Sequence, residues 1–295
     1  MTVKFSYEQA FARNIGWISR EEQGLLRQKR VAIAGLGGVG GAHLLTLARL
    51  GIGKFRIADL DTFDLVNFNR QAGAFTSTLN QPKADVLLAM ARDINPELDI
   101  QVFHDGVHND NIDTFLNGVD LYVDGLDFFV FAARAMVFAH CHTLGIPAVT
   151  AAPLGMGSAV LCFMPDGMSF EDYFGFEGRS EEELALRFMI GLSPRMLQRP
   201  YLVDPSAVDL EARRGPSTIM ACEMCAGLAA TESLKILLGR GKVLAAPHGF
   251  QFDAYRNKLV RTWRPFGHRN PIQRLMLAIA RKQLAAMRAQ ANPHG

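Results

Sequence analysis

Several features that would narrow the class of protein are scarce in this chain of 295 residues. It has four cysteines, too few for a disulfide scaffold at this length. Its 27 glycines and 13 prolines are ordinary numbers, which excludes collagen-like and low-complexity chains. Its net charge is only +2, so the overall charge indicates no particular partner. What it does have is 49% hydrophobic and 20% charged residues, a composition that excludes a disordered chain.

Long hydrophobic runs are also missing. The first 14 residues contain Glu8 and Arg13 and no continuous apolar stretch, so we identify no secretory leader. The one long uncharged stretch, residues 143–165, is interrupted by prolines and glycines, which suit two buried strands better than a membrane-spanning helix. We therefore expect a cytoplasmic protein with no membrane partner.

The charge is unevenly distributed. The last 40 residues contain nine basic side chains and no acidic one: Arg256, Lys258, Arg261, Arg264, Arg269, Arg274, Arg281, Lys282 and Arg288. Because the whole chain carries +2, the first 255 residues carry −7. An acidic body with a basic tail suits an anionic partner, but a helix lying on an acidic flank explains the same charges.

Short apolar runs alternate with helical patterns in the first half of the chain. We expect strands at residues 30–34, 55–59, 100–103, 119–124 and 147–151. Helices are expected between them, one after a glycine turn, one from Gln81-Pro82-Lys83 and one over residues 130–144. This alternation predicts an α/β fold, a Rossmann-like, mostly parallel sheet flanked by helices.

The second half of the chain has a different pattern. We expect a strand at residues 157–164, an irregular segment at 166–215, and a long helix at 219–238 closed by Gly239. A hairpin at residues 250–263 and an amphipathic basic segment at 271–290 follow. The hairpin predicts an antiparallel extension of the sheet. We divide the chain into a core, residues 1–165, and a second part of the same unit, residues 166–295.

The glycine turn carries a nucleotide-binding pattern. Gly35, Gly37 and Gly40 fit G-x-G-x-x-G, with Gly38 between them, after a strand and before a helix. Glycines let backbone N–H groups approach phosphate oxygens, and a helix N-terminus favours their negative charge. Asp59 follows the second strand, where a carboxylate can accept from both ribose hydroxyls. A dehydrogenase that binds NAD would satisfy this much of the pattern.

The next polar residues exceed what a dinucleotide site requires. Asp59, Asp61, Asn67, Asn69, Arg70 and Gln71 lie within 13 residues, and Lys83 follows. A guanidinium and an ammonium suit a triphosphate, whose charge must be neutralised before a nucleophile attacks. Asp127 follows the fourth strand, where an Asp can hold Mg²⁺ or cap the next helix.

These motifs, taken in order, resemble those of the ThiF/MoeB/HesA adenylyltransferases, relatives of ubiquitin-activating enzymes. The motifs are Gly35-x-Gly37-Gly38-x-Gly40, Asp59-x-Asp61, Asn67-x-Asn69-Arg70-Gln71, Gln81-Pro82-Lys83 and Asp127, and the similarity extends from about Arg13 to about Gly239. The resemblance implies an ATP-dependent adenylyltransferase that activates a carboxylate and releases pyrophosphate. It also implies a homodimer, a nucleotide-binding core at 1–165 and an acceptor-binding part at 166–295.

The resemblance also implies residue roles. The glycines contact the phosphates and Asp59 holds the ribose, with Asp61 and Asn69 in the same nucleotide-binding set. Asn67, Arg70 and Lys83 grip the phosphates, and Asp127 binds Mg²⁺ or its water shell. Arg13 matches an arginine that reaches the partner subunit's ATP.

Three departures from the family pattern stand out. Cys222-Glu223-Met224-Cys225 is the only C-x-x-C, and a closed zinc site needs four ligands, so we expect no zinc. Residues 166–215 contain no cysteine, which argues against a thioester step there. Phe128 replaces the family's usual Asn after Asp127.

The acceptor stays open. It is either the C-terminus of a ubiquitin-like protein, sulfur carrier or peptide, or a small molecule, or a modified tRNA nucleoside, as in the threonylcarbamoyladenosine dehydratase branch; the basic tail keeps tRNA possible. An NAD-dependent oxidoreductase is an alternative that leaves Asn67, Arg70 and Lys83 unexplained. A non-catalytic nucleotide-binding scaffold is a third.

The N-terminal segment predicts how two subunits share a site. Ser19 and Glu22 resemble a helix start, and we expect that helix to carry Leu25 and Leu26 towards the sheet. We expect the preceding segment to be extended and free to leave its own subunit. Arg13 would then meet the partner's triphosphate.

Overall fold

The computed structural model describes residues 4–209 and 212–291, with side chains described up to residue 284. One eight-stranded sheet forms its centre, in the order β3-β2-β1-β4-β5-β6-β7-β8. The strands are β1 (Arg30–Ala34), β2 (Lys54–Ala58), β3 (Asp99–Phe103), β4 (Leu121–Asp124), β5 (Ala148–Leu154), β6 (Gly157–Phe163), β7 (His248–Asp253) and β8 (Lys258–Trp263). Strands β1 to β5 pair in parallel and β5 to β8 antiparallel. The expected α/β class, with its antiparallel extension, is confirmed.

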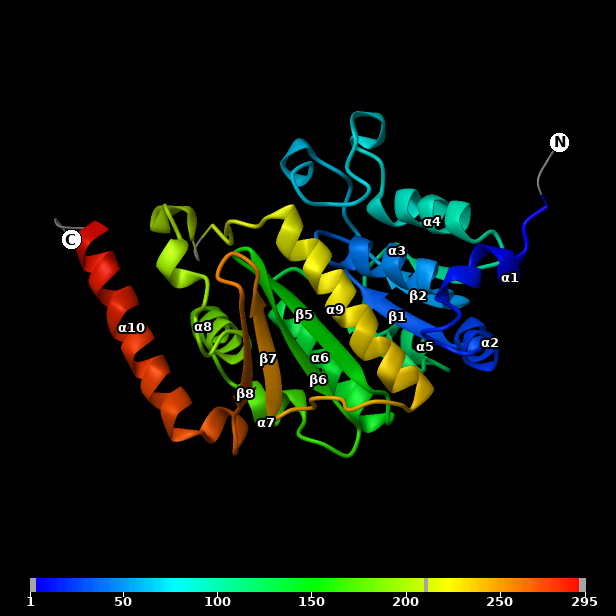
Figure 1. Ribbon diagram of the computed structural model, residues 1–295. Coiled ribbons are helices and arrows are strands. Elements are labelled where there is room, and N and C mark those ends of the chain that lie inside the picture. The colour runs from blue at the N-terminus through cyan, green and yellow to red at the C-terminus, as the bar shows by residue number, and fades with distance from the viewer. Residues whose placement is uncertain (1–3, 210–211, 292–295) are drawn as a thin grey trace.

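Helices cover both faces of this sheet (Figure 1). One face packs against α3 (Gly40–Leu50), α4 (Lys83–Ile94) and the long α9 (Ile219–Leu238), and the other against α5 (Ile112–Leu116) and α6 (Phe131–Thr143). Each face of the sheet has its own hydrophobic core, and alternate residues of β1 belong to each. Val31 and Ile33 face α3 and α9, while Ala32 and Ala34 face α6. This double burial explains why β1 is an apolar run from Val31 to Ala34 with no polar alternation.

The segment at residues 166–215 is not irregular, and that expectation was wrong. It contains α7 (Phe170–Phe174) and α8 (Glu181–Leu192), capped by Ser169 and Ser180, followed by the short 3₁₀ turns η4 (Arg199–Tyr201) and η5 (Pro205–Ala207). Nearly every residue of α8 after its first turn is buried. A helix buried all round has no polar stripe, so its sequence shows no 3.6-residue period.

The N-terminal segment begins with α1 (Tyr7–Ala10) and η1 (Ala12–Asn14), followed by α2 (Arg20–Gln28). The start of α2 is confirmed, because Ser19 and Glu22 form a reciprocal capping box. Leu26 is fully buried, but Leu25 is 54% exposed, so its expected place towards the sheet was wrong. Adjacent helical residues point about 100° apart, and α2 buries only one narrow face.

The expectation that the segment before α2 is extended and free was also wrong. Tyr7 and Phe11 are buried, and the Tyr7 hydroxyl donates to the Gly51 carbonyl at 2.5 Å. The Asn14 amide donates to the Leu50 carbonyl at 3.2 Å. Two aromatic side chains and these bonds hold the segment on its own subunit.

The C-terminal α10 (Pro271–Ala291) follows the 3₁₀ turn η6 (Gly267–Arg269) and packs on α8. Leu277 meets Leu186 and Ile190, and Arg281 pairs with Glu183 at 2.8 Å. The basic helix thus lies on an acidic flank; the Arg288 side chain is outside the described ones. In the part of the chain that the structure describes, no helix has the length and apolarity needed to span a membrane.

Candidate nucleotide site

The glycine turn lies at the carboxyl end of β1 and leads into α3. Gly35 has φ of +81°, and a Cβ there would collide with the Gly125 carbonyl; a Cβ at Gly40 would collide with the Gly35 carbonyl. These two glycines let the turn close tightly against the loop after β4. Gly37 and Gly38 are half-buried, and their N–H groups meet no protein acceptor within residues 4–209 and 212–291. They are therefore free to receive phosphate oxygens.

Asp59 lies just beyond the end of β2, beside this turn. Its carboxylate accepts from the Leu36 N–H at 2.5 Å and from the Asp61 N–H at 2.8 Å. Burial raises the pKa of Asp59, and these two bonds oppose that rise. A carboxylate has about four acceptor positions, so lone pairs are left for ribose hydroxyls.

Lys83 is the first residue of α4, and its side chain is only 7% exposed. Its ammonium donates to the exposed Asp61 carboxylate at 3.0 Å. The structure thus brings Lys83 and Asp61 together as an ion pair. Asp61 is the counter-ion that stabilises a buried lysine.

Arg70 reaches the glycine turn from the loop between β2 and α4. A Cβ on Gly38 would lie 3.5 Å from the Arg70 side chain. Its guanidinium donates to the Val66 carbonyl at 3.1 Å and to Asn69 Oδ1 at 2.9 Å. The Asn69 amide donates in turn to the Ser217 carbonyl at 2.9 Å, which ties this loop to the segment before α9.

Asn67 has a different place from the other members of the predicted set. It is buried in η2 (Leu65–Asn67), and its Oδ1 accepts from the Asp64 N–H at 2.9 Å. Its backbone carbonyl accepts from the N–H groups of Arg70 and Gln71. In this structure Asn67 shapes the loop that carries Arg70.

Two residues beside the turn were not among the predicted site residues. Gln71 is buried near Gly37, and its side-chain oxygen has no donor among the described residues. Cys222, fully buried at the start of α9, would lie 3.2 Å from a Cβ on Gly38. Gln71 belonged to the recognised motif, but no sequence signal placed Cys222 against the glycines, because 184 positions separate them.

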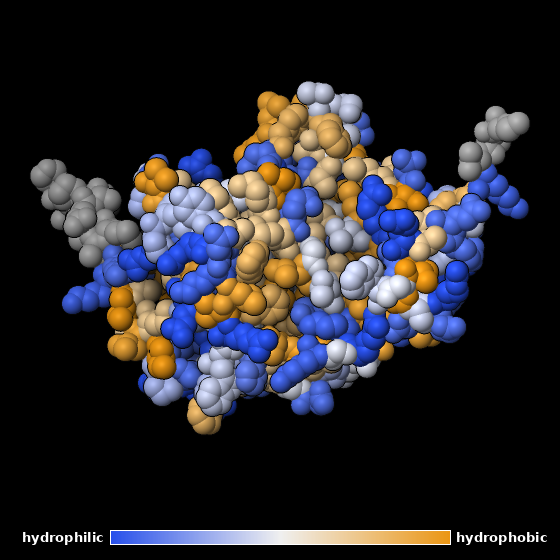
Figure 2. Space-filling view, in the orientation of Figure 1, coloured by the Kyte–Doolittle hydropathy of each residue, from blue (hydrophilic) through white to orange (hydrophobic). Residues whose placement is uncertain are grey.

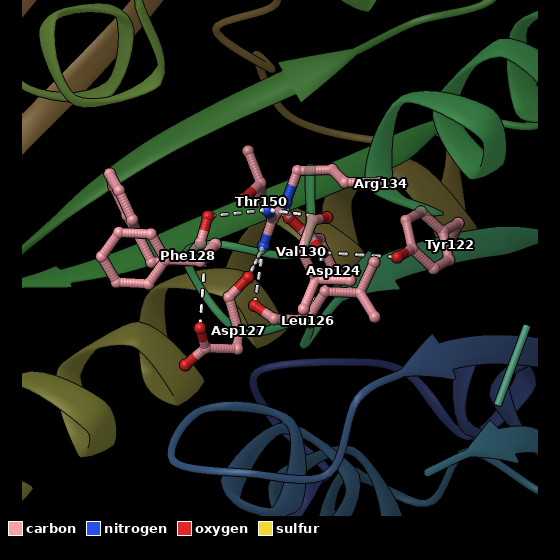
Figure 3. A network of polar contacts seen from close by, with 9 residues as sticks. Tyr122, Asp124, Leu126, Asp127, Phe128, Val130, Arg134 and Thr150 are labelled. Atoms are coloured by element: carbon pink, nitrogen blue, oxygen red, sulfur yellow. Dashed lines mark hydrogen bonds and ion pairs between the residues drawn. The ribbon is translucent and has the colours of Figure 1, made fainter. Parts of the chain in front are cut away.

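Asp127 stands on the loop between β4 and α6, and its side chain is exposed. Its Oδ1 accepts from the Phe129 N–H at 3.1 Å, and Oδ2 has no protein partner among the described residues. Its backbone carbonyl accepts from Arg134 of α6 at 2.8 Å. Figure 3 shows the Asp127 carboxylate pointing away from the Arg134 guanidinium. A carboxylate with a free oxygen, at the carboxyl edge of a parallel sheet, fits Mg²⁺.

Arg134 is the most heavily bonded side chain near the site, and sequence reasoning missed it. It forms an ion pair with Asp124 at 2.9 Å, with both side chains 2% exposed. No motif pointed to it, because a single arginine within a helix shows its partners only after folding.

Arg13 lies away from its own subunit's glycine turn. It belongs to η1, which is bonded through Asn14 to Leu50, the last residue of α3. The turn is at the other end of α3, and 11 residues of helix span about 16 Å. The structure therefore does not bring Arg13 together with the other predicted residues of the same chain.

Cys222 and Cys225 are both buried thiols on α9. Cys225 donates to Ser158 Oγ at 3.1 Å, and burial raises the pKa of both thiols. Among the described residues no group of three or more His, Cys, Asp or Glu side chains has an arrangement that could hold a metal ion. The absence of zinc stays a prediction.

The ThiF family model matches residues 11–275 of this chain. The chain belongs to the ThiF family. The family predicted from the ordered motifs is thereby confirmed.

Curated relatives within this family differ in their named activities. The chain is similar to the tRNA threonylcarbamoyladenosine dehydratase of Bacillus subtilis, with 42% identity over 90 residues, 30% of this chain and 35% of that protein. It is 26% identical to the SAMP-activating enzyme E1 of Haloferax volcanii over 77% of this chain and 74% of that one. It is 28% identical to the sulfur carrier protein ThiS adenylyltransferase of Escherichia coli over 50% and 58%. The matches to three tRNA dehydratases span 35%, 43% and 58% of those proteins' own lengths.

Solved structures share the fold. A crystal structure of PaaA superposes with a TM-score of 0.65 at 17% identity, covering 89% of this chain and 77% of PaaA. The Escherichia coli tRNA N6-threonylcarbamoyladenosine dehydratase, solved in complex with ATP, has a TM-score of 0.59 at 21% identity over 81% of this chain and 98% of its own.

Proposed function

We propose that this protein binds ATP with Mg²⁺ and activates a carboxylate as an acyl-adenylate, releasing pyrophosphate. The observation that carries this proposal is the presence of two cations at the carboxyl edge of the sheet, where Arg70 packs on Gly38 and the buried Lys83 pairs with Asp61 near Asp59. A nicotinamide site would need neither cation. Relatives named as adenylyltransferases and a related structure solved with ATP support the same reading.

In the proposed reaction, the acceptor carboxylate attacks the α-phosphorus. The new carboxylate–phosphorus bond forms as the bond to the β-phosphate oxygen breaks, and pyrophosphate leaves. The free N–H groups of Gly37 and Gly38 hold phosphate oxygens, and Arg70 and Lys83 offset the charge that develops on them. No general base is required, because a carboxylate is already ionised at pH 7.

Asp59 positions the ribose, and Asp127 is the residue that would hold Mg²⁺ or its water shell. When bound, the ion neutralises phosphate charge. Asp61 keeps Lys83 in place until the triphosphate arrives. The reaction uses ATP, which agrees with the cytoplasmic location expected from the sequence.

The rim of the site favours a protein or peptide acceptor. Six large apolar side chains on the β2–α4 loop and the start of α9 are exposed: Leu60, Leu65, Val66, Phe75, Ile219 and Met220. Hydrophobic residues gather at this edge in the space-filling view (Figure 2, top). An exposed apolar patch of this kind is typical of a surface that binds protein. We therefore propose that the acceptor is the C-terminal carboxylate of a small ubiquitin-like protein, sulfur carrier or peptide.

A modified tRNA nucleoside is the second candidate acceptor. The dehydratase relatives favour it, and so do the exposed cations of the C-terminal part, such as Arg269, Arg274 and Lys282. If tRNA is the acceptor, its affinity for the protein should fall steeply as the salt concentration rises. An apolar interface with a protein acceptor would not show this salt dependence.

The test is an assay, with ATP and Mg²⁺ present, of pyrophosphate release and of transfer of the AMP group to the acceptor. Candidate acceptors are small carrier proteins, peptides with a free C-terminal glycine, and bulk tRNA from the host. Pyrophosphate released only with a carrier or peptide supports the first reading, and pyrophosphate released only with tRNA supports the second. Binding of NAD with hydride transfer, or ATP binding without turnover on any acceptor, would contradict both.

We further propose a homodimer in which Arg13 serves the partner's site. In support, η1 is anchored at the far end of α3, about 16 Å from its own glycine turn. If Arg13 contacts a triphosphate, that triphosphate belongs to another subunit.

A further inference from the structure

Arg134 is a buried arginine that contacts neither the glycine turn nor any predicted nucleotide-binding side chain, yet all five of its N–H groups have acceptors. Its Nε donates to Asp124 Oδ2 at 2.9 Å. Its two NH2 hydrogens go to the carbonyls of Leu126 at 2.7 Å and Asp127 at 2.8 Å. Its NH1 donates to the carbonyls of Phe128 at 3.2 Å and Val130 at 3.4 Å. Four carbonyls of one five-residue loop thus converge on a single guanidinium (Figure 3).

Asp124 fixes this guanidinium from the other side. Its carboxylate also accepts from Thr150 Oγ1 at 2.9 Å, from the Tyr122 hydroxyl at 3.3 Å and from the Leu126 N–H at 3.2 Å. The ring of Phe188 packs over the guanidinium at 4.5 Å. An arginine held by a carboxylate and an aromatic face has one orientation, so its remaining donors form a fixed template.

The loop bound to this template is in contact with the nucleotide turn. The Gly125 N–H donates to the Ala34 carbonyl at 3.0 Å. A Cβ on Gly125 would lie 2.8 Å from Gly40 Cα. Because the carbonyls of Leu126, Asp127, Phe128 and Val130 turn inward to Arg134, the Asp127 side chain is left facing outward. Its free Oδ2 depends on that backbone arrangement.

We propose that Arg134, held by Asp124, is a positioning residue that sets the place of the Asp127 carboxylate for the metal–nucleotide complex. The inference rests on the proposed function only in taking Asp127 as the metal-binding group. Lysine cannot replace Arg134, because an ammonium has three donors and cannot span four carbonyls and a carboxylate.

The experiment measures Mn²⁺ binding and loop protection. For metal affinity, Mn²⁺ is titrated into the full-length protein with α,β-methylene-ATP, and free Mn²⁺ is measured by electron paramagnetic resonance. For loop order, amide hydrogen exchange of residues 126–130 is measured without nucleotide. In Asp127→Asn we expect Mn²⁺ affinity to fall about tenfold or more. In Arg134→Lys we expect a fall of similar size and faster exchange in the loop, with metal-free nucleotide affinity changed less than about threefold.

Arg187→Lys is the matched control. Arg187 is also a buried arginine paired with a carboxylate, Glu183 at 2.7 Å, and it also donates to a backbone carbonyl, that of Phe174. Among the described residues, it has no hydrogen bond or ion pair to the Asp127 loop. We expect Arg187→Lys to leave Mn²⁺ affinity and loop exchange unchanged. Thr150→Val removes one hydrogen-bond donor to Asp124 and is the substitute variant if Arg134→Lys does not fold. We expect it to weaken Mn²⁺ binding by about two- to threefold.

Each result decides something. Faster loop exchange with unchanged Mn²⁺ affinity in Arg134→Lys overturns the inference, and so does unchanged loop exchange. If Asp127→Asn weakens Mn²⁺ binding but Arg134→Lys and Thr150→Val do not, the inference fails while the proposed metal residue stands. If Asp127→Asn itself has no effect, the metal assignment in the proposed function fails and this inference with it.

Discussion

At the scale of single residues, the candidate site depends on two cations placed against a glycine turn. Lys83 is buried beside Asp61, and Arg70 packs on Gly38. Each has fewer polar partners than Arg134: Lys83 pairs with Asp61, and Arg70 donates to Val66 and Asn69 of its own loop.

Lys83→Ala and Arg70→Ala should each slow adenylylation much more than they weaken ATP binding. Loss of one preorganised charge stabiliser costs about 2.7–4 kcal/mol in the transition state, or about 10²–10³ in rate. The measurement is acceptor-dependent pyrophosphate release with ATP affinity measured alongside. Lys29→Ala is the control, because Lys29 is a partly exposed lysine paired with Asp120 away from the site. Full turnover in both site variants would remove the assignment.

Gly40→Ala should destabilise the protein by about 1–3 kcal/mol, since its Cβ would overlap the Gly35 carbonyl. Gly24→Ala is the matched change, because Gly24 is helical with open space around its Cβ position. The free energy of unfolding of Gly24→Ala should rise by about 0.5–1 kcal/mol. Urea unfolding of the two variants checks both; equal stabilities would contradict the close packing of the turn.

At the scale of elements, the packing of α3 and α9 on the sheet buries groups that most cores avoid. His43 of α3 is fully buried, and its two ring nitrogens have no hydrogen-bond partner among the described residues. Burial lowers the pKa of His43 to about 4, although the nearby Asp124 charge opposes the shift. The histidine is therefore neutral in the folded protein at pH 5 to 7.

Stability should fall as the pH drops from about 6.5 to about 4. In this window the unfolded chain binds a proton at His43 that the folded chain does not, which favours unfolding by up to about 3 kcal/mol. His43→Leu should flatten this part of the pH–stability curve. Urea midpoints between pH 4 and pH 7.5 test it, and parallel curves for the two proteins would contradict it.

The first turns of α9 give a prediction about metal. Purified protein should carry no stoichiometric zinc, because Cys222 and Cys225 supply two thiolates where a closed site needs four ligands. Elemental analysis of the protein decides this. One zinc per chain would refute the prediction, and zinc at half that amount would indicate a site shared by two subunits.

At the scale of the whole molecule, the sheet runs through both parts of the chain, and the anchored N-terminal segment lies at the end of α3 opposite the glycine turn. Arg13 is exposed on η1, near the far end of α3. In a site shared between subunits, Arg13 would contact the partner's triphosphate, although it lies too far from the glycine turn of its own subunit to do so there.

Mixing tests the shared site. Arg13→Ala and Lys83→Ala homodimers should each be poorly active, but a mixed dimer contains one site with both defects and one with neither. Activity should then partly return, to about a quarter of the wild-type value when equal amounts exchange freely, since half of the dimers are mixed and each has one intact site of two. Absence of recovery, with subunit exchange demonstrated by labelled chains, would exclude the trans arginine.

The sequence by itself determined the features that depend on local chemistry. A glycine turn after an apolar strand, an Asp at the end of the next strand, the Ser19–Glu22 cap and Gly239 at the end of α9 are each set by backbone conformation or by neighbouring side chains, so their order along the chain was enough to predict them. The ordered motifs also predicted the family.

Only the tertiary structure decided which distant residues meet. Cys222 lies against Gly38, and Arg134 binds the carbonyls of the Asp127 loop. Asn67 shapes the loop that carries Arg70. The helix α8 and the anchored segment at Tyr7 and Phe11 were missed because burial on all sides, or by two aromatic side chains, leaves no periodic signal in the sequence. Long-range contacts are set by how the elements pack, and a pattern read within one element carries no information about its neighbour.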